Sequence, residues 1–188
     1  MRRGFAAILA LMLCLSGCGG QPESMNEALD FRAQLLNAGG CSFTAEVAAQ
    51  YEQYASKFVL QCRYDTETRQ TQFEVIAPET VAGITGTVSE NRQTVRFDDV
   101  ALELELLADN KLAPVALPSI LAQSWAESYI VSAGSDQDYE AVVYQNGYDQ
   151  DELKVETWYQ YGLPVYTDLW YQGVNEAEVT LSDFKFNT

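Results

Sequence analysis

From residue 41 onward the sequence alternates between apolar and polar residues, and this alternation constrains the fold more than any other feature. Residues 41–51 place Phe43, Ala45, Val47, Ala49 and Tyr51 on one side and mostly polar residues on the other. Residues 58–64 and 71–77 repeat the pattern. Because successive side chains of a strand point to opposite faces, the pattern predicts half-buried strands of an antiparallel sheet.

Most of the remaining chain continues in the same way. We expect further strands at 81–88, 95–97, 102–106, 129–133, 139–145, 153–161, 163–171 and 178–186. Glycine and asparagine residues mark the turns between the later strands. With no repeat of solenoid period and no second linker, residues 24–188 are expected to form one α+β domain. Its core is a large, curved antiparallel sheet of about ten strands, an open half-barrel.

Two segments have helical spacing. Ser24 and Glu27 have the spacing of a capping box, which predicts a helix from Ser24 with Ala28, Phe31, Leu35 and Ala38 on one stripe. The two glycines at 39–40 should end this helix. A proline opens the segment 118–128, which predicts a second helix there. We expect both helices to lie on the concave face of the sheet.

The N-terminus has the pattern of an export signal. Arg2 and Arg3 precede an apolar run from Phe5 to Leu15. This run is too short to span a bilayer, which takes about 20 residues. Residues 1–17 are therefore predicted to be a signal peptide that is removed from the mature protein.

The residues Leu-Ser-Gly-Cys at 15–18 resemble the lipobox of bacterial lipoproteins. The resemblance implies that Cys18 becomes the N-terminus and carries acyl chains such as palmitate. Two or more acyl chains anchor a protein stably, because each buried CH₂ contributes about 0.8 kcal/mol. Residues 18–23 are then a lipidated tether on the outer face of the bacterial cytoplasmic membrane, or on the outer membrane of a Gram-negative host. The alternative is ordinary signal cleavage that leaves Cys18 as a free thiol.

The composition excludes several classes of chemistry. The 188 residues include no histidine, which excludes nucleophiles that depend on a histidine base and zinc sites with a histidine ligand. The net charge of −16, or −18 after loss of Arg2 and Arg3, disfavours nucleic acid as a partner. We interpret the acidity as a means of keeping an exported domain soluble.

Acidic residues are frequent, but none of their groupings predicts a catalytic or metal site. The groupings are Asp98-Asp99, Glu103 with Glu105, and residues 149–152. A glycosidase needs two carboxylates across a cleft, whereas adjacent acids in turns are normally solvated. Residues 149–152 also lack the spacing of an EF-hand, so we favour a solvated loop over a calcium site. We predict no enzyme activity, no cofactor and no metal.

Cys41 and Cys62 are the cysteines of the predicted domain. Paired cysteines of exported proteins often form a disulfide. With a turn near residues 52–57, however, Cys62 faces about Val47 on the neighbouring strand. A direct bridge then needs a shifted register or a bulge, so the disulfide stays an open alternative.

The chain is rich in aromatic residues, with 11 tyrosines, 8 phenylalanines and 3 tryptophans. At alternate strand positions such residues usually pack in the core. They also suit an apolar groove between sheet and helices, where acyl chains would bind. The candidate groove residues are Phe43, Leu60, Phe73, Val95, Phe97, Trp158 and Trp170.

Three segments resemble the LolA/LolB-like lipoprotein-carrier fold. They are PETVAGI at 78–84, WYQYGLPV at 158–165 and VTLSDFKFN at 179–187. Over residues 24–188 the chain is most similar to the small lipidated, GerS-like germination lipoproteins of spore-forming Gram-positive bacteria. The resemblance implies an accessory protein that binds an envelope partner such as a cell-wall (cortex) amidase. The alternative function is a binder or carrier of lipid or lipoprotein acyl chains in a concave apolar groove.

Overall fold

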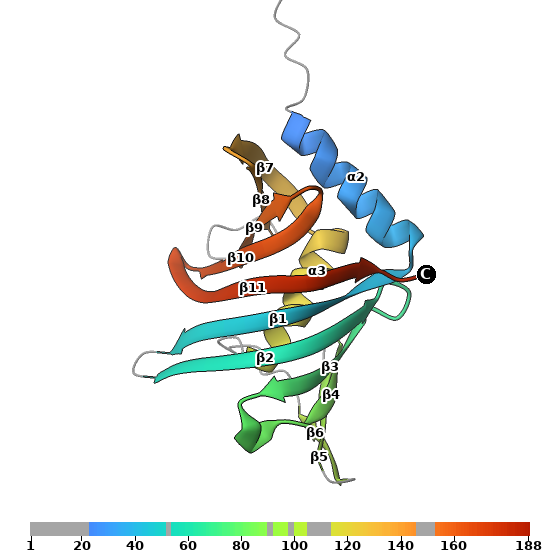
Figure 1. Ribbon diagram of the computed structural model, residues 1–188, viewed down its shortest axis with the longest axis vertical. Coiled ribbons are helices and arrows are strands. Elements are labelled where there is room, and N and C mark those ends of the chain that lie inside the picture. The colour runs from blue at the N-terminus through green and yellow to red at the C-terminus, as the bar shows by residue number, and fades with distance from the viewer. Residues whose placement is uncertain (1–22, 52–53, 90–91, 98–99, 105–113, 146–152) are drawn as a thin grey trace, which may run out of the picture.

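One open antiparallel sheet forms the body of the protein. The computed structural model describes residues 23–51, 54–89, 92–97, 100–104, 114–145 and 153–188. These contain 11 strands in the order β6-β5-β4-β3-β2-β1-β11-β10-β9-β8-β7, with helix α3 behind the central strands and helix α2 beside β7 and β8 (Figure 1). The predicted fold class, an α+β half-barrel with an N-terminal and a mid-chain helix, is confirmed.

The helices and strands have the following bounds. The α-helices of the described residues are α2 (Glu23–Asn37) and α3 (Leu117–Glu127), and their short 3₁₀ helices are η1 (Glu79–Val81) and η2 (Pro114–Ala116). The first six strands are β1 (Gly40–Tyr51), β2 (Tyr54–Asp65), β3 (Gln70–Ala77), β4 (Thr85–Ser89), β5 (Arg92–Phe97) and β6 (Val100–Leu104). The others are β7 (Tyr129–Asp136), β8 (Tyr139–Gln145), β9 (Lys154–Gln160), β10 (Leu163–Tyr171) and β11 (Val174–Phe186).

The first and last strands pair at the centre of the sheet. Cys41 on β1 lies opposite Tyr64 on β2 and opposite Phe186 on β11. From this centre, consecutive antiparallel pairs lead to β6 at one edge and to β7 at the other. Helix α3 follows β6 and precedes β7, so it lies in the segment that links the two edges across one face.

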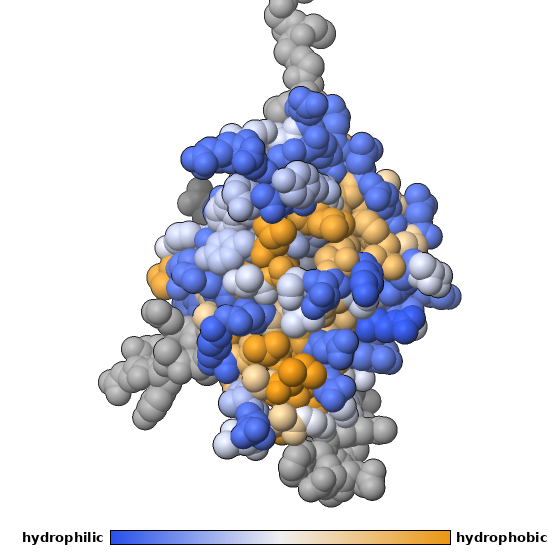
Figure 2. All heavy atoms as spheres, viewed as in Figure 1, coloured by the Kyte–Doolittle hydropathy of each residue, from blue (hydrophilic) through white to orange (hydrophobic). Residues whose placement is uncertain are grey.

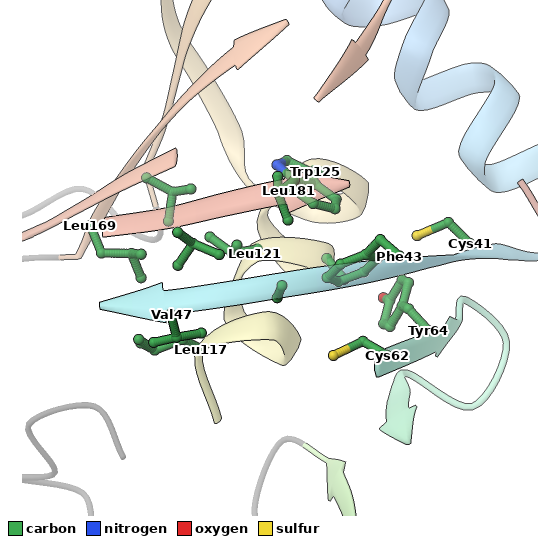
Figure 3. Close-up of a cluster of buried hydrophobic side chains, with 14 of the residues drawn as sticks. Cys41, Phe43, Val47, Cys62, Tyr64, Leu117, Leu121, Trp125, Leu169 and Leu181 are labelled. Atoms are coloured by element: carbon green, nitrogen blue, oxygen red, sulfur yellow. The ribbon is translucent and has the colours of Figure 1, made fainter. Parts of the chain in front are cut away.

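The two faces of the sheet differ in burial as the alternation predicts. Phe43, Val47 and Leu60 are buried on the face that packs against α3, which we call the inner face. The intervening residues point to the opposite, outer face, where Glu46 is half-buried and Gln61 is exposed. Figure 3 shows Phe43 and Val47 of β1 beside side chains of α3, among them Leu117 and Leu121.

Three local expectations were wrong. Helix α2 begins at Glu23, so Ser24 lies inside its first turn, where it is buried, and does not cap it. The fourth strand begins at Thr85 rather than at 81, because η1 occupies Glu79–Val81. Residues 51 and 54 form the last pair of β1 and β2, so only two residues connect these strands and their register is shifted.

The glycines at 39–40 end α2 as expected. Gly39 has a φ of 71° and Gly40 a φ of 131°, both in the region that favours glycine. A Cβ on Gly40 would lie 2.0 Å from the carbonyl oxygen of Tyr64. Only glycine therefore fits at the point where α2 turns into the central strand.

Candidate functional site

Helix α3 fills the inner face of the sheet. The Trp125 side chain is fully buried, with its ring centroid 5.5 Å from that of Phe43 and 6.1 Å from that of Phe31. Its indole Nε1–H donates to Thr157 Oγ1 on β9 at 3.0 Å, and Thr167 Oγ1 on β10 donates to the same oxygen at 3.1 Å. Trp125 thus joins α3 to strands of both halves of the sheet.

Arg32 on α2 donates hydrogen bonds to carbonyl groups at the C-terminal end of α3. Its Nε donates to the Trp125 carbonyl oxygen at 2.7 Å, and a terminal guanidinium nitrogen donates to that of Ser128 at 2.7 Å. A cation at a helix C-terminus is favoured by the helix dipole and by the unpaired carbonyl groups there. The guanidinium also lies 5.7 Å from the centre of the Tyr144 ring. The two helices therefore cover the sheet as one layer.

Two buried tyrosines of the inner face form a hydrogen bond with each other through their hydroxyl groups. The hydroxyl oxygens of Tyr144 and Tyr159 are 2.7 Å apart. Burial raises the pKa of Tyr144 to about 12 and raises that of Tyr159 well above its ordinary value, so both stay neutral at physiological pH. A pair of neutral hydroxyl groups that share a hydrogen bond lowers the stability of a core little. The inner face is well packed around this pair.

The structure does not bring the seven predicted groove residues together. Phe43, Leu60 and Phe73 are buried on the inner face. Trp158 and Trp170 alternate with buried Thr157 and Leu169, so they lie on the outer face. Val95 and Phe97 lie on β5, paired with Leu102 and Val100, and their side chains lie outside the described part of the structure.

Cys18 and the rest of residues 1–22 lie outside the described residues. The predicted signal peptide, lipidated tether and anchor therefore stay predictions. Within the part of the chain that the structure describes, no helix has the length and apolar character needed to cross a membrane.

Cys41 and Cys62 are free thiols in the structure, and both are buried. Because the β1–β2 connection is short, Cys62 faces Phe43 rather than Val47, and Cys41 faces Tyr64. The Tyr64 ring lies between the two cysteines (Figure 3). Burial raises the pKa of Cys41 to about 12 and also raises that of Cys62, where the charge of Cys41 adds to the effect. Thiols of this kind are poor nucleophiles at neutral pH.

Two hollows open on the surface of the described part. One, of about 480 Å³, lies mainly on β2, β3 and β4, and its lining includes the predicted groove residue Phe73 and Cys62 beside Gln61, Arg63, Gln72, Glu74, Thr85 and Thr87. The other, of about 520 Å³, lies between α2 and two strand turns, and its lining includes Glu27, Asp30, Asp138, Tyr139, Glu140 and Tyr161. Most of these side chains are polar or charged, unlike the lining of an acyl-binding groove.

Three carboxylates lie side by side on the outer face. Asp168 on β10 is directly opposite Glu156 on β9 and Glu178 on β11, and we call these three residues the acid row. The rings of Trp158 and Tyr166 contact each other beside it, with centroids 5.3 Å apart. Sequence analysis missed this row because it depends on the register of three strands. Its only signal was an acidic residue at an outward position of each strand.

Known proteins resemble this chain in fold. No family model and no curated protein matches the sequence. A LolA superfamily protein from Nitrosomonas europaea is 12% identical over 86% of this chain and 94% of its own, with a TM-score of 0.46. A putative outer membrane lipoprotein-sorting domain from Vibrio parahaemolyticus is 11% identical over 88% and 93%, with a TM-score of 0.48. A chain in the structure of the CwlD amidase from Clostridioides difficile in complex with the GerS lipoprotein is 17% identical over 90% and 99%, with a TM-score of 0.45. Such similarities concern the fold alone.

Proposed function

We propose that this protein is a non-enzymatic lipoprotein, anchored through Cys18, that binds a protein partner at the bacterial cell envelope. The observation that carries the proposal is the filled inner face, where Trp125 and its neighbours occupy the space that a carrier would leave for its cargo. The export pattern and the lipobox-like residues 15–18 support the envelope location.

A carrier of acyl chains needs an apolar groove that opens to solvent. On the inner face the relative exposures of Phe43, Leu60 and Phe73 are 2%, 0% and 3%, and all three belong to one continuous core. These side chains stabilise the domain, so the surface that is left for recognition is the exterior of the sheet and helices. This favours protein binding over lipid carriage.

The anchor keeps the domain close to the membrane. Only residues 19–22 separate Cys18 from the start of α2 at Glu23. An extended chain spans at most about 3.5 Å per residue, so this tether reaches less than about 20 Å. The partner is therefore another envelope protein, and the sequence resemblance to germination lipoproteins favours a cell-wall amidase.

The anchor is tested by replacing Cys18 in the full chain. Cys18→Ala is expected to move the protein out of the membrane fraction and to abolish labelling with a palmitate analogue. Ser16→Ala keeps a small residue before the cysteine and serves as the matched control, which should stay lipidated. Persistent membrane attachment of Cys18→Ala would refute the anchor.

The partner is tested by affinity capture of the anchored protein from solubilised membranes, followed by native mass spectrometry. We expect a specific envelope protein in the complex and no lipid beyond the covalent anchor. Recovery of the chain with a stoichiometric non-covalent acyl ligand and without a protein partner would instead establish the carrier function.

A further inference from the structure

The acid row is an unusual arrangement for adjacent strands. Side chains directly opposite each other in an antiparallel pair have Cβ atoms about 5 Å apart, and like charges there are destabilising. Asp168 nevertheless faces Glu156 on one side and Glu178 on the other. Burial, together with the charge of Asp168, raises the pKa of Glu156. The isolated chain thus tolerates a repulsion that it could avoid with neutral residues.

No cation forms an ion pair with these three carboxylates among the described residues. Lys57, two strands from Glu178, is paired with Glu46. Lys154 lies on β9 two residues before Glu156 and faces Trp170 on β10. Among the described residues, Lys154 is therefore near the row without an ion pair to it, and most of the charge of the row is left for an external group to balance.

Neutral donors hold the central carboxylate in place. The Tyr166 hydroxyl donates to Asp168 Oδ1 at 2.9 Å, and Asn175 Nδ2 donates to the same oxygen at 3.0 Å. These hydrogen bonds fix the direction of the carboxylate and leave its Oδ2 for another donor. A carboxylate that is already fixed loses little conformational freedom on binding.

Two unpaired polar atoms lie beside the row. Trp170 and Asn175 face each other across β10 and β11, and Trp170 Nε1 and Asn175 Oδ1 are shielded from solvent without a partner among the described residues. An unpaired buried polar atom costs about 1–3 kcal/mol. The hydrogen bonds of these two atoms are therefore not made within the described residues.

The distance that the acid row spans indicates which kind of ligand can contact all three carboxylates. Adjacent strands lie about 4.8 Å apart, so three carboxylates on three strands extend over about 10 Å, more than one metal ion can bridge. In the described part, no group of three or more histidine, cysteine or acidic residues has the arrangement of a metal site. Two basic side chains of one peptide segment can span the length of the acid row. They carry positive charge opposite to that of the carboxylates, and together they offer several hydrogen-bond donors.

We propose that the acid row, with Trp158, Tyr166 and Trp170, is the docking surface for a basic segment of the protein partner. This inference rests on the proposed function and identifies the surface and the chemistry that it would use. Tryptophan and tyrosine contribute strongly to protein interfaces, and their rings attract arginine and lysine side chains. The carboxylates supply charge complementarity, and the aromatic rings supply contact area.

The test uses the full-length, anchored protein in nanodiscs of neutral phosphatidylcholine. Calorimetry measures the Kd for a synthetic peptide of alternating arginine and threonine, and for a neutral peptide with glutamine in place of arginine. The variant D168N/E178Q removes two charges from the row. Its matched control, D136N/D138N, removes two charges from exposed positions at the turn between β7 and β8.

We expect the arginine peptide to bind and the glutamine peptide not to bind. D168N/E178Q should weaken binding at least about tenfold, which is about 1.4 kcal/mol, and the control less than twofold. Glu156→Gln, a milder change, should weaken it by an intermediate factor. Equal effects of the two double variants would show a non-specific field effect and overturn the proposal, as would the absence of arginine-dependent binding.

Two further outcomes would overturn the docking surface in different ways. If calcium chloride alone binds to the row and displaces the peptide, the row is a metal site and the proposal fails. If a partner is captured from membranes equally well by the parent chain and by D168N/E178Q, the accessory function stands and this docking surface is wrong. Failure of the Cys18 anchor, in contrast, would leave the peptide affinities unchanged.

Discussion

Two tryptophan side chains on opposite faces of the same sheet show how differently the two faces are completed. On the inner face, the Trp125 Nε1–H donates to Thr157, and the ring is enclosed by aromatic neighbours. On the outer face, Trp170 Nε1 has no acceptor among the described residues, although it is equally hidden from water. Figure 2, which looks at the outer side of the central strands, shows hydrophilic side chains around smaller apolar areas.

The difference indicates that the inner face stabilises the fold, whereas the outer face carries the proposed recognition surface. The inner face buries the largest side chains of the domain, so it accounts for most of the folding free energy, although Tyr64 Oη and Thr71 Oγ1 have no hydrogen-bond partner there among the described residues. What distinguishes the outer face of β9, β10 and β11 is the set of like charges directly opposite each other, which opposes folding. These charges carry the docking surface proposed above.

The largest expected effect concerns the accessibility of the inner face. With its pKa raised to about 12, Cys41 holds about a thousandfold less thiolate at neutral pH than an ordinary thiol, so its reaction with a maleimide should be slower by at least that factor. Mass spectrometry of labelled native and unfolded protein measures both rates. An exposed cysteine introduced by Thr180→Cys on the outer side of β11 is the control and should react at an ordinary rate. Fast labelling of Cys41 in the native state would show that the inner face opens.

Tryptophan replacement on each face measures its contribution to folding. Trp125→Ala removes a fully buried ring and its hydrogen bond, and should lower the free energy of unfolding by about 3–5 kcal/mol. Trp158→Ala, which loses a half-buried ring and its contact with Tyr166, should cost about 1 kcal/mol. Urea denaturation gives both values. Equal losses would mean that the outer face also carries the fold.

Arg32 tests whether α2 and α3 act as one layer. Arg32→Met keeps much of the side-chain length but removes its hydrogen bonds to the Trp125 and Ser128 carbonyl groups, at a cost of about 1.5–3 kcal/mol in unfolding free energy. Arg63→Met, at an exposed outer position of β2, should change stability by less than about 0.5 kcal/mol. If the two variants lose the same amount in urea denaturation, the link between the helices is unimportant.

The smallest effect concerns the repulsion within the acid row. Because the pKa of Glu156 is raised, the native protein holds its proton more tightly than the unfolded chain does, so stability falls as the pH rises through the interval between the ordinary and the raised pKa. Glu156→Gln should remove this dependence and stabilise the protein by about 0.2–1 kcal/mol at neutral pH. Urea denaturation across a pH series measures this, with Glu74→Gln, opposite neutral Gln61 and Thr85, as the control. Destabilisation of Glu156→Gln at neutral pH would contradict repulsion in the row.

Much of the fold could be predicted from alternation because burial on one face leaves a period of two in the sequence. The β8 and β10 segments were predicted with their observed bounds, and the glycines after α2 mark its true end. The pairing of β1 with β11 could not be predicted from the sequence, because the alternation within one strand does not identify the strand that pairs with it. The start of α2 was misplaced because a capping pattern is one local signal among several.

The site could be predicted much less well than the fold. Phe43 and Trp158 both sit at alternating positions, and only the pairing of the strands shows that they lie on opposite faces. The position of Cys62 opposite Phe43 depends on a connection of two residues between Tyr51 and Tyr54. A one-residue change in register reverses every such assignment, which is why sequence patterns alone did not reveal the acid row.

The three tryptophans of the chain allow one measurement to compare both faces directly, since Trp125 is inside and Trp158 and Trp170 are outside. The full-length protein, labelled with 5-fluorotryptophan and held in nanodiscs, gives one ¹⁹F signal for each. Addition of the arginine peptide should shift the Trp158 and Trp170 signals and leave that of Trp125 in place, and addition of palmitate should shift none of them. A palmitate-dependent shift of the Trp125 signal, or a peptide that leaves both outer signals unchanged, would contradict a filled inner face and a binding outer face.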